Sequence, residues 1–393
     1  MDPLAALLHL EVAEKARRGL EHTPQEIAQQ PGTWLTTFHR LEAQFEEVRE
    51  FLTGAGVNGA ADRRPTVFLI GAGTSDYIGH SLHLLMRSRW QCEVIPVAST
   101  SLLPDFADYV LPGRRALWIS FSRSGDSPEG VAVLERALSE VPQISHLLVT
   151  CNSDGRMKRA LEGRANGFAI VLDDATNDRG LAMTSSFTNM VLAGQILAHA
   201  WSMEEYAPIL RSLVRAGESL LPRAAQLASD LAAQGYSKAC FVGSGVLAGT
   251  ATECALKLLE LTAGRVPAVT QSTLALRHGP MAALDAETLF VGLVSTEEPR
   301  RKYEVDLLRE VSSKHLARMR IAVAVDGAGL GGEADHVLTP ETGDAIPDHY
   351  RPVLDVLFGQ LLGLFASIHA GLKPDTPSPS GAISRVVQNV GIY

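Results

Sequence analysis

One sequence pattern occurs twice and limits what the chain can fold into: an apolar run ends in Gly-x-Gly and continues into a helix-length segment. Val67–Ile70 runs into Gly71-Ala72-Gly73, and Ala239–Val242 runs into Gly243-Ser244-Gly245. Further mostly apolar runs lie at 116–119, 146–150, 289–294 and 321–325. Buried strands that alternate with helices are typical of parallel sheets covered on both faces. The pattern predicts an α/β fold with two similar doubly wound parallel-sheet domains and flanking helices; a single long sheet is the alternative.

The regions around these two halves divide the chain into four parts. We expect an N-terminal helical arm over residues 1–49, a first sheet domain over 50–205, a second over 206–370, and a C-terminal tail over 371–393 that contributes to the site. In the arm, Thr23-Pro24-Gln25-Glu26 has the spacing of a capping box, with proline at the first helical position.

Composition excludes several classes of protein. The 393 residues include 35 Lys and Arg against 44 Asp and Glu, so the formal net charge is −9. Nonspecific nucleic-acid binding requires basic side chains and is not expected. The four cysteines form no CxxC pair and are too few for a disulfide framework. Neither a signal-peptide pattern nor an apolar run of about 18 residues is present. We expect a reduced, cytoplasmic protein that binds neither nucleic acid nor membrane.

Hydroxyl groups cluster after two strands of the first half. Gly73, Thr74 and Ser75 follow one strand at a predicted helix N-terminus, where backbone N–H groups favour an anion. The next cluster contains three hydroxyls and a guanidinium group, which donate hydrogen bonds to phosphate oxygens: Ser122, Arg123, Ser124 and Ser127. The carboxyl ends of parallel strands meet at one sheet edge, so the two loops predict a site for a phosphate monoester.

Some other interpretations of these loops remain open, and two nucleotide-binding motifs are excluded. Ser127 followed by Pro128 also fits a helix N-cap. Asp76 stands where a dinucleotide fingerprint needs its third glycine, and the chain has no Walker A motif. A third polar cluster, which includes Thr184 and Ser185, either closes the same pocket or caps a helix.

The second half contains candidates for acid–base chemistry. Glu253, Lys257 and Glu260 are spaced i, i+4 and i+7, which places two carboxylates and an ammonium group on one helix face. A solvated row of salt bridges has the same spacing. His278 precedes Gly279-Pro280 and is either a catalytic group or an ordinary loop histidine.

Together these motifs resemble the sugar isomerase (SIS) superfamily in its two-domain form. The motifs are Gly71–Ser75, Ser122–Ser127, Ala255–Glu260 and His278-Gly279-Pro280. Within the superfamily the chain resembles the galactosamine-6-phosphate deaminase/isomerase group, also called tagatose-6-phosphate ketose/aldose isomerase. That narrower resemblance covers nearly the whole chain and includes Thr23–Ile27, Thr176–Gly180, Ala182–Phe187 and Leu259–Gly264.

The resemblance implies roles for the matching side chains. The loop hydroxyls hold the sugar phosphate: Ser75, Ser122, Ser124 and Ser127. Arg123 stands where relatives can carry an amide. Glu260 is the base that moves a proton between C1 and C2, and Lys257 and Glu253 are its partners on the helix.

Two further roles concern residues outside that helix. His278 is associated with opening of the sugar ring and can come from a neighbouring subunit, which implies a homodimer with the site at the subunit interface. Arg385 stands near the position where synthase-like relatives carry a lysine. An arginine stays charged and cannot form a Schiff base, but it can bind phosphate or an enolate oxygen.

We therefore expect an enzyme that converts galactosamine 6-phosphate to tagatose 6-phosphate and ammonia by aldose–ketose proton transfer, without a metal or redox cofactor. A fructosamine-6-phosphate deglycase is the alternative enzyme. A sugar-phosphate sensor without catalytic activity is the alternative from another class.

Overall fold

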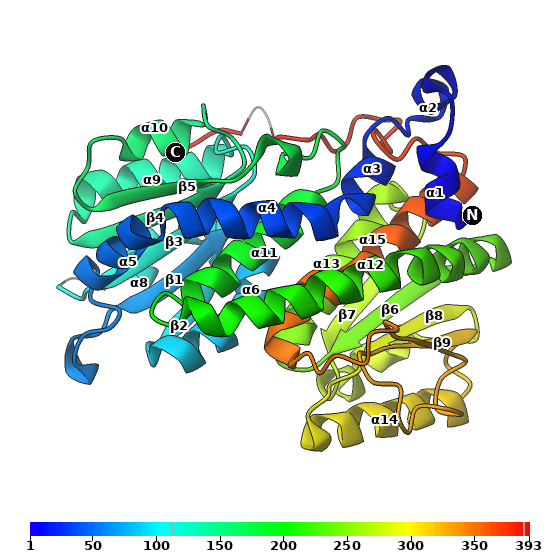
Figure 1. Cartoon of the computed structure of the whole chain (residues 1–393). Helices are drawn as coiled ribbons and strands as arrows, with labels where there is room; N and C mark the ends of the chain where they lie inside the picture. Colours follow the sequence, from blue (N-terminus) through cyan, green and yellow to red (C-terminus); the bar gives the residue numbers. More distant parts are fainter. Residues whose placement is uncertain (112, 388–389) are drawn as a thin grey trace. The chain divides into compact units, whose positions relative to one another are not determined.

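The computed structural model describes residues 1–111, 113–387 and 390–393, and the chain divides into two compact units. The first-sheet unit comprises Thr33–Asn177, Ser185–Pro208 and Ile383–Tyr393. The second-sheet unit comprises Met1–Gly32, Asp178–Thr184 and Ile209–Ala382. Across the described residues each unit holds a five-stranded parallel sheet (Figure 1), so the predicted α/β fold with two sheets is confirmed and the single long sheet is wrong.

The sheet of the first-sheet unit has the strand order β2-β1-β3-β4-β5. The chain runs from β1 to β2 on one side and then crosses to β3 on the other, so the connections that follow β1 and β3 start side by side and continue in opposite directions along the sheet. The strands are β1 (Thr66–Gly71), β2 (Val94–Ala98), β3 (Ala116–Ser122), β4 (Ile144–Thr150) and β5 (Gly167–Val171). The helices that alternate with them are α6 (Thr74–Trp90), α7 (Ser99–Leu102), α8 (Phe106–Tyr109), α9 (Pro128–Glu140), α10 (Arg156–Leu161) and α11 (Ser185–Ala198).

Helices cover both faces of this sheet, as its apolar strands predict. On one face Ile70 and Trp118 pack in a buried cluster with Val133 of α9. On the other face α6 approaches so closely that a Cβ added at Gly79 would lie 3.0 Å from Cβ of Leu69. Successive residues of β1, such as Leu69 and Ile70, therefore point to helices on opposite faces of the sheet.

The second-sheet unit repeats the same topology, with the order β10-β9-β8-β6-β7. Its strands are β6 (Lys238–Gly243), β7 (Ala268–Ser272), β8 (Thr288–Leu293), β9 (Met319–Val323) and β10 (His336–Leu338). Its helices include α13 (Val246–Leu261), α14 (Glu298–Ser313) and α15 (Pro352–His369). Gly73 and Gly245 precede the first helix of each repeat with φ of 56° and 59°, a conformation that glycine adopts without steric cost.

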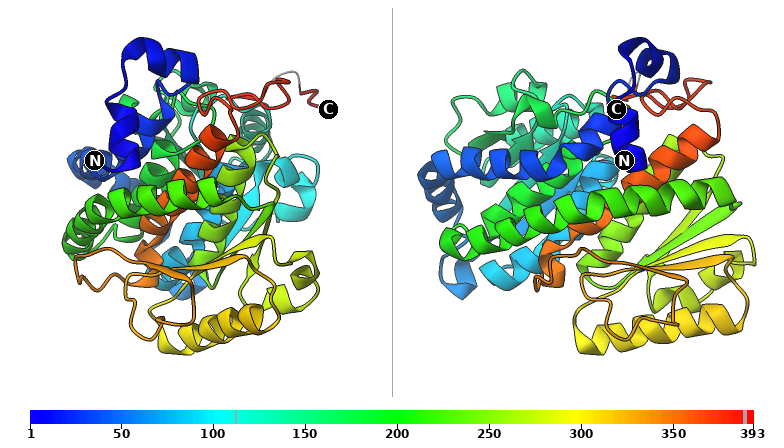
Figure 2. Two further views of the ribbon diagram at one scale, coloured as in Figure 1. Left: turned by 90° about the vertical axis from the view of Figure 1, so that its right-hand side faces the viewer. Right: turned by 45° about the vertical axis from the view of Figure 1, so that its right-hand side comes forward.

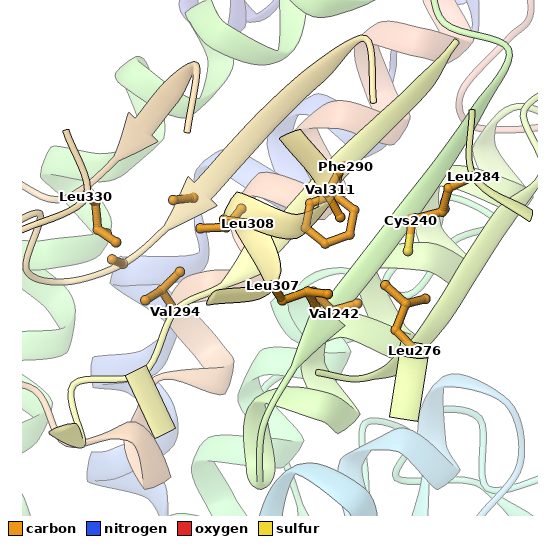
Figure 3. Packing of buried hydrophobic residues seen from close by; sticks show 12 residues of the cluster. Cys240, Val242, Leu276, Leu284, Phe290, Val294, Leu307, Leu308, Val311 and Leu330 are labelled. Carbon is orange, nitrogen blue, oxygen red and sulfur yellow. The ribbon is translucent and has the colours of Figure 1, made fainter. Parts of the chain in front are cut away.

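Helix α14 lies along one face of this sheet, and α13 and α15 lie on the other (Figures 1 and 2). Between the sheet and α14 is a core of buried apolar side chains, in which Phe290 of β8 packs near Val311 of α14 (Figure 3). The other members that Figure 3 labels are Cys240, Val242, Leu276, Leu284, Val294, Leu307, Leu308 and Leu330.

Two glycines let α15 approach α13. A Cβ at Gly359 would lie 2.5 Å from Sγ of Cys254, and one at Gly363 would lie 2.8 Å from the carbonyl oxygen of Lys257. Helix α15 is long and apolar enough to cross a membrane, but 89% of it is buried inside the protein. Packing in the core of a folded protein accounts for that apolarity.

The N-terminal arm is helical, as predicted. Its helices are α1 (Pro3–Leu8), α2 (Val12–Arg18), α3 (Thr23–Ala28), α4 (Gln30–Ala43) and α5 (Phe45–Gly54). The long helix α12 (Met203–Gln234) and the short helices η1 (Ala61–Arg63), η2 (Asp174–Thr176), η3 (Ala275–Arg277), η4 (Pro280–Ala283) and η5 (Asp348–Tyr350) complete the described secondary structure. All four cysteines are free and buried.

The expected capping box at the start of α3 is wrong. The hydroxyl of Thr23 donates to Asp375 Oδ1 at 2.7 Å, and the carboxylate of Glu26 accepts from the backbone N–H of Arg179 at 2.5 Å and of Gly180 at 3.3 Å. Both side chains therefore bind segments far away in the sequence. Together they fasten α3 to the segment 178–184 and to the stretch after α15, all within the second-sheet unit.

Burial, together with the nearby charge of Asp178, raises the pKa of Glu26 from 4.5 to about 8. The folded protein therefore binds a proton at this carboxyl group more tightly than the unfolded chain does. The stabilisation from that proton is complete below pH 4.5 and is lost as the pH rises through about 8.

The glycine contact gives a first prediction. Gly359→Ala should lower the free energy of unfolding by about 1–3 kcal/mol, because the added methyl group cannot fit against Cys254 without moving α15. Gly54→Ala is the matched control, since no atom lies within 4 Å of the Cβ position at the end of α5. Denaturant unfolding of both variants tests this; equal stability of Gly359→Ala and wild type would contradict the close contact.

The pKa of Glu26 gives a second prediction. Glu26→Gln keeps an oxygen acceptor for the two backbone N–H groups but cannot ionise. The free energy of unfolding of Glu26→Gln, relative to that of the wild type, should therefore increase as the pH rises from about 6 to about 9. Glu298→Gln, whose side chain is 71% exposed, should show a constant difference from wild type. A constant difference for Glu26→Gln as well would mean that Glu26 is ionised in the fold.

Candidate active site

The loop after β3 presents hydroxyl groups in a fixed conformation. Ser122 Oγ accepts a hydrogen bond from the backbone N–H of Gly125 at 3.1 Å, and Ser124 Oγ accepts from the N–H of Asp126 at 3.2 Å. A hydroxyl that accepts one hydrogen bond can still donate its own proton. Among the described residues neither proton has an acceptor, so both are available to an anion.

Interactions at the end of β4 hold this loop in place. Asn152 Nδ2 donates to the carbonyl oxygen of Ser124 at 2.7 Å. The carboxylate of Asp126 accepts from the backbone N–H of Arg156 at 2.9 Å. Gly125 has φ +64°, and an added Cβ would lie 3.1 Å from Cα of Gly155. The carboxylate of Asp126 therefore helps to hold the loop in its conformation.

Helix α9 begins at Pro128 with Ser127 at its N-cap position, which confirms the predicted helix start. The Ser127 side chain nevertheless makes no capping hydrogen bond. Capping alone does not account for this serine, and its hydroxyl adds a third donor to the loop.

The loop after β1 provides the second part of the predicted anion site. Gly73 precedes α6, and Thr74 and Ser75 form its first turn with 5% and 7% of their surfaces exposed. Since β1 and β3 are hydrogen-bonded neighbours, the two loops leave the same sheet edge side by side. The structure therefore brings Ser75 and Ser122 to one edge of one sheet, as the sequence predicts.

Thr184 and Ser185 lie directly before and at the start of α11, and both are fully buried. The hydroxyl of Thr184 donates to Asp178 Oδ1 at 3.0 Å, and its backbone N–H donates to Asp178 Oδ2 at 2.7 Å. These contacts bind Thr184 to Asp178 and decide neither for helix capping nor for closure of the pocket. Substrate binding by the pair stays a prediction.

The acid–base residues lie on α13, as predicted. Lys257 Nζ lies 3.2 Å from Glu253 Oε1 and donates to Glu260 Oε2 at 2.7 Å. The side chains of Lys257 and Glu253 are fully buried, whereas 24% of the Glu260 side chain is exposed. The alternative of a solvated row of salt bridges is therefore wrong for this face.

The charges on this face stabilise one another. Burial alone would lower the pKa of Lys257, but the carboxylates of Glu253 and Glu260 outweigh it, so the pKa lies above its ordinary value. Lys257 is thus a permanent cation that orients the accessible carboxylate beside it. A carboxylate held by a buried ammonium group suits proton transfer next to a developing oxyanion.

His278 and Arg385 are both exposed. His278 directly follows η3 on the second-sheet unit. Arg385 belongs to the first-sheet unit, where its Nη2 donates to Asn177 Oδ1 at 2.7 Å. Its carbonyl oxygen accepts from Nη2 of Arg123 at 2.5 Å. Arg123, predicted to bind phosphate, therefore also contacts the tail.

The equivalent edge of the second sheet is filled by the chain's own carboxylates. After β8, the backbone N–H of Ser295 donates to Glu304 at 2.6 Å, and that of Thr296 donates to Asp348 at 3.0 Å. The hydroxyls of both residues also donate to Asp348. A phosphate would therefore meet negative charge at the loop after β8, in contrast to the corresponding loop after β3 in the first-sheet unit.

A buried arginine completes this filled edge. Arg351 is fully buried, lies 3.1 Å from Asp348, and donates to the carbonyl oxygens of Val294 and Val323 at 2.7 and 3.4 Å. It therefore ties the ends of β8 and β9 to the start of α15. Burial raises the pKa of its other partner, Asp355, to about 6, although the arginine opposes that rise.

Two residues in the site region, Asn152 and Asn177, were not predicted from the sequence. Asn152 supports the β3 loop, and Asn177 binds Arg385. A signal existed for Asn152, because it follows a buried strand at the carboxyl edge of the sheet. Asn177 lies in the Thr176–Gly180 motif, but nothing in that motif connects it with the tail. Assembly of the candidate residues into one active site stays a prediction.

Comparisons with known proteins support the resemblance. No family model matches the chain. A D-galactosamine-6-phosphate deaminase of Escherichia coli O157:H7 is 33% identical over 378 residues, which are 94% of this chain and 95% of that protein. A protein of Streptomyces coelicolor that carries the same name provisionally is 37% identical over 375 residues, 95% of each chain.

Solved structures agree with the sequence relatives. The tagatose-6-phosphate ketose/aldose isomerase of Escherichia coli matches with a TM-score of 0.81 and 31% identity over 94% of this chain and 96% of that one. A Clostridium novyi protein described provisionally in the same way matches with a TM-score of 0.90 and 30% identity over 96% of each chain. The chain therefore belongs to the galactosamine-6-phosphate deaminase and tagatose-6-phosphate ketose/aldose isomerase group of the sugar isomerase (SIS) family.

Proposed function

We propose that this enzyme converts galactosamine 6-phosphate and water to tagatose 6-phosphate and ammonia. The observation that carries the proposal is the arrangement on α13, where buried Lys257 holds the partly exposed carboxylate of Glu260. The deaminase name of relatives at 33% identity over nearly the full chain supports the choice of substrate.

The phosphate end of the substrate would bind at the first sheet. The hydroxyl groups of Ser122, Ser124 and Ser127 would donate hydrogen bonds to phosphate oxygens. Ser75 and the backbone N–H groups at the N-terminus of α6 would do the same. Binding energy from this remote end would position C1 and C2 for the reaction.

The reacting end would meet Glu260. Its carboxylate removes the proton from C2 of the open-chain amino aldose, the electrons form a double bond between C1 and C2, and the C1 oxygen takes up a proton to complete the enolamine. Return of the first proton to C1 gives a C2 iminium ion. Water adds to C2, and ammonia and one proton leave, which balances the proton taken up at the C1 oxygen. Lys257, or Arg385 from the tail, would stabilise the negative charge that develops on the C1 oxygen.

His278 would assist ring opening before this step. Its exposed position suits a residue offered to a neighbouring subunit, so we include a homodimer with a shared site in the proposal. A cytoplasmic location fits a substrate that is a phosphorylated sugar.

Glu260→Gln tests the assigned base. Turnover should fall by about 10²- to 10⁴-fold, because the amide cannot accept the C2 proton, while affinity for the sugar phosphate stays near that of wild type. Ammonia and ketose release should be measured separately on a panel of hexosamine 6-phosphates and ketohexose 6-phosphates. Glu298→Gln, an exposed change on α14, is the control. Unchanged turnover in Glu260→Gln would remove this residue from the mechanism.

Ser122→Ala with Ser124→Ala tests the phosphate site. Loss of two donors to an anion should raise KM for the phosphorylated sugar by about tenfold or more, with little change for the unphosphorylated sugar. Ser139→Ala, on the exposed side of α9, is the matched control. Equal losses with both sugars would show that the two hydroxyls have a structural role.

A further inference from the structure

Residues 383–393, the last part of the C-terminal tail, make directed contacts with the rest of the first-sheet unit. Arg123 Nη2 donates to the carbonyl oxygen of Arg385 at 2.5 Å, and Arg385 Nη2 donates to Asn177 Oδ1 at 2.7 Å. The tail has no helix or strand among its described residues. Chain ends usually fray unless something ties them down, so these contacts decide where the Arg385 guanidinium group lies.

Arg123, which donates the hydrogen bond to the carbonyl oxygen of Arg385, has a fixed backbone. Arg123 directly follows β3 and is only 6% exposed. Its carbonyl oxygen accepts from the backbone N–H of Cys151 at 3.2 Å and from the hydroxyl of Thr150 at 3.4 Å. The backbone of Arg123 is therefore fixed to the end of β4, and its guanidinium group reaches the tail from that fixed base.

Asn177, which accepts the hydrogen bond from the Arg385 side chain, also has a fixed backbone. Asn177 ends η2, and its backbone N–H donates to the carbonyl oxygen of Asp174 at 3.0 Å. Its neighbour Thr176 is fully buried, donates to the carbonyl oxygen of Asp173 at 2.7 Å, and lies 3.4 Å from Sγ of Cys151. Both anchors of the tail thus converge on the end of β4, beside the loop that carries Ser122 and Ser124.

We propose that Arg123 and Asn177 are positioning residues, which hold the tail at the β3 loop and set the place of the Arg385 guanidinium group. The inference rests on the proposed function for the role of Arg385 in the reaction, but the tail contacts themselves do not depend on it. Arg123 acts through the backbone of the tail, and Asn177 acts through the charged side chain. Neither residue needs to touch the reacting atoms.

Hydrogen–deuterium exchange of the full-length protein tests the tail contacts without any substrate. Arg123→Ala and Asn177→Ala should each speed exchange of the amides after Ala382 by about tenfold or more, the effect of losing a hydrogen bond to a charged group. Asn177→Asp keeps the acceptor and should leave this exchange slow. Arg211→Ala, an exposed change on α12 at a residue without a hydrogen bond or ion pair among the described residues, is the control. Unchanged tail exchange in both alanine variants would overturn the proposal.

A double-mutant cycle tests whether Asn177 acts through Arg385. Asn177→Ala should lower kcat by about tenfold with a smaller change in KM, and Asn177→Asp should retain most of kcat. In the Arg385→Ala background, Asn177→Ala should have no further effect. Additive losses in the double variant would show that Asn177 acts by another route.

The two experiments separate the two proposals. If the wild-type protein has no activity on any sugar phosphate, the proposed function fails, while the exchange experiment still decides whether Arg123 and Asn177 hold the tail. If the activity is present and tail exchange does not respond, the positioning role fails alone.

Discussion

The candidate acid–base face of α13 depends on an ammonium group that has been removed from water between two carboxylates. Burying a charge is costly unless partners compensate it, and Lys257 has Glu253 at 3.2 Å and Glu260 at 2.7 Å. Helix α15 approaches the backbone of α13 closely at Gly359 and Gly363. The result is a carboxylate, Glu260, that remains accessible while its orientation is set from inside the protein.

The two sheets could be predicted from the sequence because their central strands are apolar on both faces. β1, β3, β4, β6, β8 and β9 all match apolar runs, and the helices between them follow. The edge strands carry weaker signals. β2 contains Pro96, and β10 has only three residues, so their place in the sheets comes from pairing with a neighbour.

Predictions that depended on local spacing had mixed outcomes, for a physical reason. The interval from Glu253 to Glu260 correctly indicated one helix face, but it could not tell a solvated face from a buried one, because burial depends on the rest of the fold. The interval from Thr23 to Glu26 indicated a capping box, yet both side chains bind partners more than 150 residues away. Side-chain partners that are distant in sequence leave no trace in a local pattern.

The filled edge of the second sheet has a consequence for the symmetry of the molecule. In that half Asp348 and Glu304 supply the negative charge that the loop after β8 would otherwise take from solution. The duplicated architecture is therefore an unequal pair: the loop after β8 binds carboxylates of its own unit, whereas the hydroxyl protons of Ser122 and Ser124 have no acceptor among the described residues. Asp348, Arg351 and Asp355 form one buried network in that half, so removing any one of these charges would leave the others incompletely compensated.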